Sequence, residues 1–165
     1  MTISVSRCRR PNICNLENPL RSAIFIPADF KFGRDGKMPV ILITGTGSYG
    51  GEAFEHNFAK LLKTSSVGDP VWLNIPERMC DESPMNAEHV AYAINYISSR
   101  LREKLAIVAW SQDNLSTQWS LEHWPSTPDQ VSNFIYLSAD FRGTINAWGL
   151  CPFNGTQPCH SAVWH

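Results

Sequence analysis

The sequence predicts an α/β fold in which a mostly parallel sheet is flanked by helices. Three short apolar runs rich in β-branched residues, at 39–44, 70–75 and 105–110, are typical of strands buried on both faces. A long segment at 86–104 carries an apolar stripe at helical spacing, which predicts an amphipathic helix between two of these strands. Strands that alternate with helices indicate parallel pairing through right-handed crossovers.

Composition limits the classes of protein to consider. The chain has 165 residues, of which 43% are hydrophobic, and this predicts a single folded domain over 1–165. A net charge of -1 gives no basic surface for nucleic acid, which is therefore not an expected partner. No apolar run is long enough to span a bilayer, so we expect no transmembrane segment. The first ten residues lack the apolar stretch of a signal peptide, which by itself indicates a cytoplasmic protein.

The first half of the chain is expected to supply three strands, with one helix between the second strand, 39–44, and the third, 70–75. Residues 1–22 should be irregular, and 23–30 should contain a short strand. A glycine-rich loop, 45–51, follows the strand at 39–44. Large apolar residues then recur at helical spacing and predict one helix over 53–63.

The second half repeats the alternation of helix and strand. The long helix should begin at Asn86, because asparagine is a good N-cap. A further helix is expected over 112–124, with Leu115 and Trp119 facing inward. Residues 131–138 form the last predicted strand.

The five cysteines leave two interpretations open. Cys151 and Cys159 flank a Pro/Gly segment in an irregular tail, 151–165, where a short-loop disulfide can form. Free thiols in loops are the alternative. No cysteine or histidine spacing typical of zinc occurs, so we expect no metal site.

Ser111 lies where a buried strand gives way to a helix. A sharp turn there would expose its hydroxyl at the top of the sheet, and the backbone N–H of Gln112 would point to the same place. A simple helix N-cap is the alternative role for this serine. The usual G-x-S-x-G pattern is altered, because Ala109 and Asp113 replace its glycines.

The glycine-rich loop also has two interpretations. Residues 45–50 spell G-x-G-x-x-G, which can cradle a dinucleotide phosphate, but no acidic residue closes the next strand. Alternatively, Thr46 supplies part of an oxyanion hole.

Several blocks, in order and spacing, resemble the Candida antarctica lipase B-like family of fungal α/β-hydrolases. They are "PVILITGTGSYG", "DPVWLNIP", "NAEHVAYAINYIS", "AWSQDNLSTQWSLEHWPST" and "LSADFRGT". The resemblance implies the N-terminal half to two-thirds of a truncated α/β-hydrolase fold. It also implies the strand order 71–75, 39–44, 105–110 and 131–138, with an exposed apolar edge at the last strand.

The resemblance implies a function as well. The family hydrolyses carboxylic esters, including lipids, through an acyl-enzyme, without metal or organic cofactor, and is secreted. Ser111 then matches the nucleophile, Thr46 and Gln112 the oxyanion hole, and Asp140 a residue lining the acyl side of the pocket. The resemblance therefore implies an ester or lipid as the substrate and contact of the protein with a lipid interface.

Two departures from the family pattern bear on activity. Asp113 replaces a small residue, and its carboxylate either faces solvent or opposes charge on the substrate oxygen. The triad acid and histidine of the family lie beyond the matched blocks, so this chain should be weak or inactive. A substitute triad of Ser111, Asp140 and His160 has the right chain order, although the family places that aspartate in the pocket. A non-catalytic remnant that binds a ligand or partner is the competing function.

Overall fold

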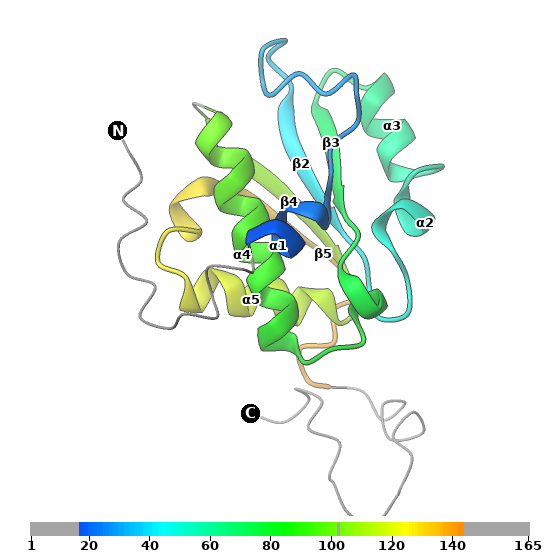
Figure 1. The fold of residues 1–165 in the computed structure, drawn as a ribbon. Helices are drawn as coiled ribbons and strands as arrows, with labels where there is room; N and C mark the ends of the chain where they lie inside the picture. The colour runs from blue at the N-terminus through cyan, green and yellow to red at the C-terminus, as the bar shows by residue number, and fades with distance from the viewer. Residues whose placement is uncertain (1–16, 102, 144–165) are drawn as a thin grey trace, which may run out of the picture.

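The computed structural model describes residues 17–101 and 103–143, and its centre is a five-stranded sheet (Figure 1). The strands are β1 (Ile24–Phe25), β2 (Met38–Ile43), β3 (Gly68–Leu73), β4 (Leu105–Trp110) and β5 (Val131–Leu137). Their order is β1-β3-β2-β4-β5. β1 is antiparallel to β3, whereas the other three pairings are parallel. The predicted mostly parallel sheet and its strand order are confirmed.

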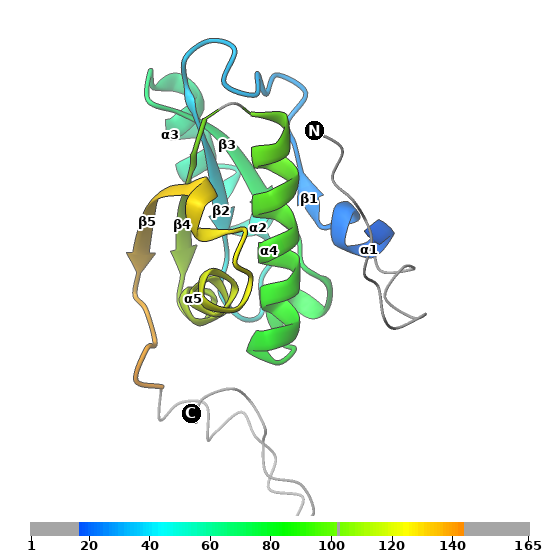
Figure 2. The same cartoon turned by 90° about the vertical axis from the view of Figure 1, so that its left-hand side faces the viewer.

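Helices cover both faces of this sheet (Figures 1 and 2). They are α1 (Glu17–Ser22), α2 (Gly50–Phe54), α3 (Phe58–Thr64), α4 (Ser83–Arg100) and α5 (Asp113–His123). Two 3₁₀ turns, η1 (Pro76–Met79) and η2 (Pro128–Gln130), precede α4 and β5. α4 and α5 lie together on one face, and α2 and α3 lie on the other. No helix within the described ranges is long and apolar enough to cross a membrane.

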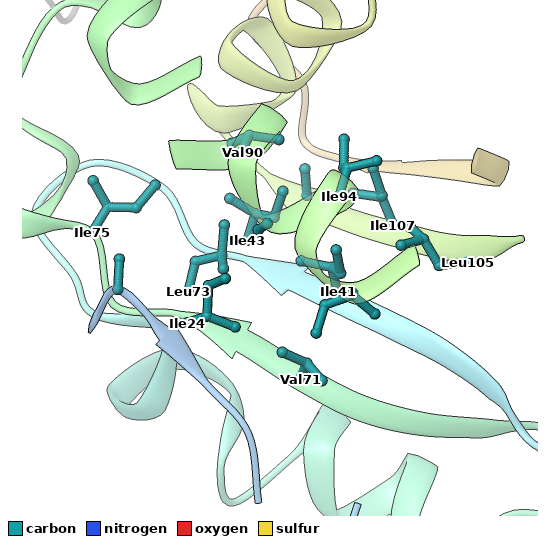
Figure 3. Close-up of a cluster of buried hydrophobic side chains, with 14 of the residues drawn as sticks. Ile24, Ile41, Ile43, Val71, Leu73, Ile75, Val90, Ile94, Leu105 and Ile107 are labelled. Carbon is teal, nitrogen blue, oxygen red and sulfur yellow. The ribbon is translucent and has the colours of Figure 1, made fainter. Parts of the chain in front are cut away.

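Alternating side chains of each central strand build two cores. Ile41 and Ile43 of β2 pack toward α4, in the cluster of Figure 3. Val40 and Leu42, which alternate with them along the strand, pack instead with Phe54 of α2. Burial of each such side chain contributes about 1.5–3 kcal/mol. The apolar runs lack polar alternation because these strands are buried on both faces.

Two predictions for the first half of the chain are wrong. The helix expected over 53–63 is two helices, α2 and α3, because Asn57 interrupts it and its side chain accepts a hydrogen bond from the Phe58 N–H. Residues 17–22, expected to be irregular, form α1. The rest of that segment, 1–16, lies outside the described residues, as do the tail at 151–165 and its cysteines.

Asn86 is not the N-cap of the long helix. α4 begins three residues earlier, at Ser83, and Pro84 is tolerated in its first turn. The Asn86 side chain is buried and donates hydrogen bonds to the carbonyls of Met79 (3.3 Å) and Asp81 (2.9 Å). It therefore ties the η1 turn to α4.

The inward face of α5 also differs from the prediction. Leu115 and Trp119 are only half-buried. The buried positions are polar and mostly small: Asp113, Asn114, Ser116, Thr117 and Ser120. Small side chains let α5 lie close against α4, and apolar periodicity could not reveal such a face.

Among the described residues, the last strand has no partner on its outer side and is an edge of the sheet, as expected. Ile135 and Tyr136 of β5 are 50% and 55% exposed. In Figure 2, β5 lies at one side of the sheet, beside β4 alone. This edge is a surface on which another chain could pair or aggregate.

Candidate active site

Ser111 occupies a strained turn between β4 and α5. Its φ of 58° lies in the left-handed region, which a residue with a Cβ adopts only when its surroundings enforce it. The surroundings here include the Leu137 carbonyl at the end of β5, which accepts a hydrogen bond of 2.9 Å from the Ser111 N–H. The serine is thereby presented at the carboxyl edge of the sheet, as the strand-to-helix pattern predicts.

Asn114 holds this turn in place through hydrogen bonds, a role that was not predicted from the sequence. Its side-chain amide donates to the carbonyls of Ser111 (2.8 Å) and Leu137 (3.2 Å). The side chain is fully buried. The signal available in the sequence was an asparagine three residues after the serine, because asparagine side chains commonly form hydrogen bonds with nearby backbone groups.

The glycine-rich loop after β2 lies directly against the serine. A Cβ placed on Gly45 would lie 2.8 Å from the Ser111 Cβ and 3.2 Å from the Trp110 carbonyl oxygen. The first distance is shorter than real Cβ contacts allow and the second is tight, so a side chain at this position would push the two turns apart. Loop 45–51 and the serine turn therefore form one site at the edge of the sheet.

Thr46 and Gln112 meet across this site. The Thr46 hydroxyl donates a hydrogen bond to the side-chain oxygen of Gln112. Within 17–101 and 103–143, neither backbone N–H of these two residues donates to a protein acceptor. Two donors beside a serine hydroxyl are the arrangement that stabilises an oxyanion.

Asp140 contacts the serine hydroxyl. The Ser111 hydroxyl donates to Asp140 Oδ2 at 3.4 Å, a long hydrogen bond. The structure thus brings together four predicted residues, Ser111, Gln112, Thr46 and Asp140.

No histidine in the described part of the chain contacts this serine. His56 is exposed between α2 and α3, and His89 lies on α4. His123 stacks on Trp119 at the far end of α5. His160, the third member of the substitute triad, lies outside the described residues.

Asp113 does not face solvent, which was one of the two orientations considered from the sequence. It is 1% exposed, and neither carboxyl oxygen has a hydrogen-bond partner of normal geometry among the described residues. Burial raises its pKa well above the ordinary value of 3.8, and the nearby Ser116 hydroxyl only partly opposes this shift. The environment therefore favours the neutral carboxyl, which carries no charge against the site.

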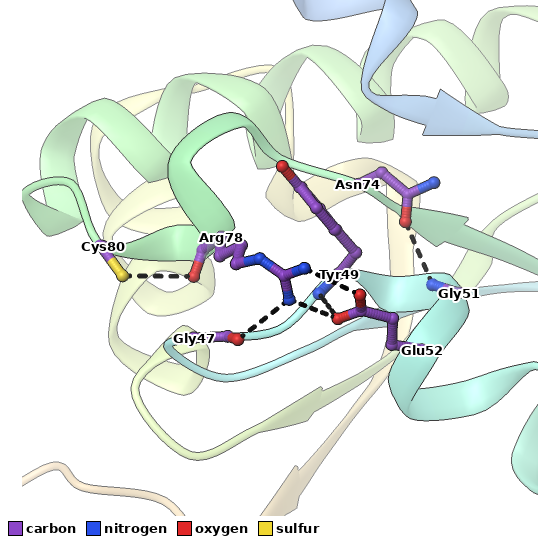
Figure 4. Close-up of polar contacts among 7 residues, drawn as sticks. All are labelled: Gly47, Tyr49, Gly51, Glu52, Asn74, Arg78 and Cys80. Atoms are coloured by element: carbon purple, nitrogen blue, oxygen red, sulfur yellow. Dashed lines mark hydrogen bonds and ion pairs between the residues drawn. The ribbon is translucent and has the colours of Figure 1, made fainter.

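The internal bonds of the loop argue against the phosphate-binding alternative (Figure 4). The N–H groups of Gly47, Tyr49 and Gly51 donate to the Arg78 carbonyl (2.7 Å), Glu52 Oε2 (3.1 Å) and Asn74 Oδ1 (3.1 Å). A phosphate would need such donors free and would also meet the Glu52 carboxylate. Among the described residues, no group of three or more histidine, cysteine or acidic side chains could hold a metal ion.

A left-handed serine between a parallel strand and a helix, faced by a glycine loop, defines this fold as an α/β-hydrolase. The comparisons with known proteins agree. The chain is 31% identical over 127 residues to lipase B from Pseudozyma antarctica, covering 76% of this chain and 36% of that protein. No protein-family profile matches it.

Solved structures give the same result. The crystal structure of Aspergillus fumigatus lipase B has a TM-score of 0.73 and 48% identity, covering 76% of this chain and 30% of that one. Mature lipase BlEst2 from Bacillus licheniformis shares only the fold, with a TM-score of 0.61, 17% identity, and 75% and 49% of the chains covered. The resemblance to the Candida antarctica lipase B-like family is confirmed. The chain spans about a third of the length of the two lipases B, less than the expected half to two-thirds.

Proposed function

We propose that the chain carries the nucleophile and oxyanion hole of a carboxylic ester hydrolase, a lipase or esterase. The observation that carries this proposal is the left-handed Ser111 packed against Gly45. Such a turn is strained, and strain of this kind is characteristic of functional sites. The relatives are lipases, which supports an ester substrate.

In the proposed reaction, the Ser111 oxygen attacks the ester carbonyl and the ester C–O bond breaks, so that the alcohol leaves with the serine proton and an acyl-enzyme forms. Water then hydrolyses the acyl-enzyme to the carboxylic acid and restores the serine. The N–H groups of Thr46 and Gln112 hold the developing oxyanion, and one such donor is typically worth about 10²–10³ in rate. Asp140 lines the acyl side of the pocket. Its contact with the serine oxygen supports this role over that of a triad acid, which would contact the histidine instead.

Within residues 17–101 and 103–143, this machinery lacks a general base. The described residues place no histidine at the serine, so we propose that this chain is weak or inactive in turnover. Loss of the base typically leaves roughly 10³–10⁴-fold acceleration over water, from the oxyanion hole and binding. The same observation favours the second candidate function, a non-catalytic remnant that binds a ligand or partner.

Substrate and location belong to the same proposal. Trp110, which precedes the serine, and Phe141, which follows Asp140, are 41% and 43% exposed. Apolar rings in this position suit an acyl chain or a lipid interface. Secretion is proposed on the family resemblance alone.

A fluorophosphonate probe separates the two candidate functions. We expect slow labelling that Ser111→Ala abolishes, with retention in Ser99→Ala, a matched change at an exposed serine on α4. Hydrolysis of a short p-nitrophenyl ester should be weak and should fall with the same variant. A folded chain that takes no label would exclude the hydrolase and support the remnant.

A further inference from the structure

Arg78, in the turn after β3, contacts the glycine loop and the start of α2 (Figure 4). Its guanidinium binds the Glu52 carboxylate through two parallel contacts, Nη1 to Oε2 at 2.6 Å and Nη2 to Oε1 at 3.0 Å. It also lies over the Tyr49 ring, 4.6 Å from the centroid. A bidentate pair with a stacked ring fixes direction as well as distance.

Contacts with backbone groups of the loop add to these side-chain contacts. The Gly47 N–H donates to the Arg78 carbonyl at 2.7 Å, while Arg78 Nη1 approaches the Gly47 carbonyl at 3.4 Å. The Glu52 carboxylate also accepts from the Tyr49 N–H at 3.1 Å. One arginine therefore holds the loop at Gly47, Tyr49 and Glu52, immediately after the oxyanion residue Thr46.

The turn that carries Arg78 is itself anchored in the core. Glu77, Arg78 and Met79 have φ values of 51°, 54° and 61°, a left-handed run that residues with a Cβ rarely adopt. Met79 is 1% exposed, and its carbonyl accepts from the buried Asn86 side chain. The strained turn thus links the core rigidly to the loop.

We propose that Arg78 is a positioning residue, which through Glu52 fixes loop 45–51 so that the Thr46 N–H faces the Ser111 hydroxyl. The catalytic consequence rests on the proposed function, whereas the fixing of the loop does not. The guanidinium lowers the pKa of Glu52, as expected for a carboxylate held in its charged form.

The chain offers an internal control. Lys63 and Asp29 form another exposed ion pair, with a single contact of 3.0 Å. It joins α3 to the segment after β1 and does not touch the glycine loop. If the Arg78–Glu52 pair were only a surface ion pair, its removal would have the same small effect on loop 45–51 as removal of the Lys63–Asp29 pair.

The first experiment measures backbone hydrogen exchange by mass spectrometry in the full chain. Glu52→Gln removes the charge but keeps the side-chain shape, and its exposed position lets the protein fold. We expect about threefold to fivefold faster exchange in 45–51, the upper part of the range for loss of an exposed pair. Asp29→Asn should leave this segment unchanged. Unaltered exchange in Glu52→Gln would overturn the proposal.

The second experiment measures the rate of fluorophosphonate labelling at Ser111. Glu52→Gln and Arg78→Met should slow it by at least about threefold, and Arg78→Lys should restore it only in part because lysine cannot bind bidentately. Looser loop exchange with an unchanged labelling rate would overturn the positioning role. If the unmodified chain takes no label, the proposed function fails, and exchange alone decides whether Arg78 fixes the loop.

Discussion

The buried carboxyl of Asp113 makes this protein's stability depend on pH in a way that one substitution can remove. The side chain is 1% exposed, without a hydrogen-bond partner of normal geometry within the described residues, and burial raises its pKa well above 3.8. Asp113→Asn keeps the shape and abolishes the titration. We expect the variant to be more stable than the parent chain at neutral pH.

The sign and the size follow from proton binding. As pH rises above about 4, the unfolded chain releases this proton while the folded chain keeps it, so folding becomes progressively less favourable. Stability contributed by the neutral carboxyl is thus full below the unfolded pKa and is lost as pH rises through the folded one. One proton gives a slope of at most about 1.4 kcal/mol per pH unit.

Urea unfolding at pH 4, 5, 6 and 7, followed by tryptophan fluorescence, measures this difference. The advantage of Asp113→Asn should be near zero at pH 4 and should grow with pH. Glu122→Gln, an equal charge change at an exposed position of the same helix, should alter the free energy of unfolding by less than about 0.5 kcal/mol. A difference in the free energy of unfolding between Asp113→Asn and the parent chain that stays constant from pH 4 to pH 7 would show that Asp113 does not titrate as argued.

Four further substitutions test the packing. Gly45→Ala, which forces a Cβ to 2.8 Å from the Ser111 Cβ, should slow labelling of the serine at least about tenfold; an unchanged rate would refute the close approach. Asn114→Ala should lower the free energy of unfolding by about 2 kcal/mol for two lost hydrogen bonds, as measured in urea. Ile107→Ala in the fully buried core should lower it by about 2–5 kcal/mol in the same assay. Ile135→Lys on the exposed edge should reduce self-association in sedimentation while changing stability by less than about 0.5 kcal/mol.

The strands could be predicted because their physical signal is local and strong. An apolar β-branched run such as 105–110 has few alternatives to a buried strand, and β4 begins and ends at these residues. Ser111 followed from its place after that strand. Its left-handed backbone and its contact with Gly45 agree with this prediction.

What could not be predicted depends on contacts between distant segments. The polar face of α5 gives no apolar period, so Leu115 was expected to point inward where Asn114 and Ser116 do. The pairing of Arg78 with Glu52 crosses 26 residues and joins the η1 turn to α2, which no spacing rule reveals. The orientation of Asp113 likewise follows from the packing of α5, not from its sequence neighbours.

The central claim is that Ser111 is the nucleophile of this site, and mapping a covalent adduct tests it most directly. The full chain is treated with a fluorophosphonate and digested, and its peptides are analysed by mass spectrometry. We predict a single phosphonyl adduct, on Ser111, that is absent from Ser111→Ala. An adduct on another residue, or none on protein that remains folded, would contradict the account.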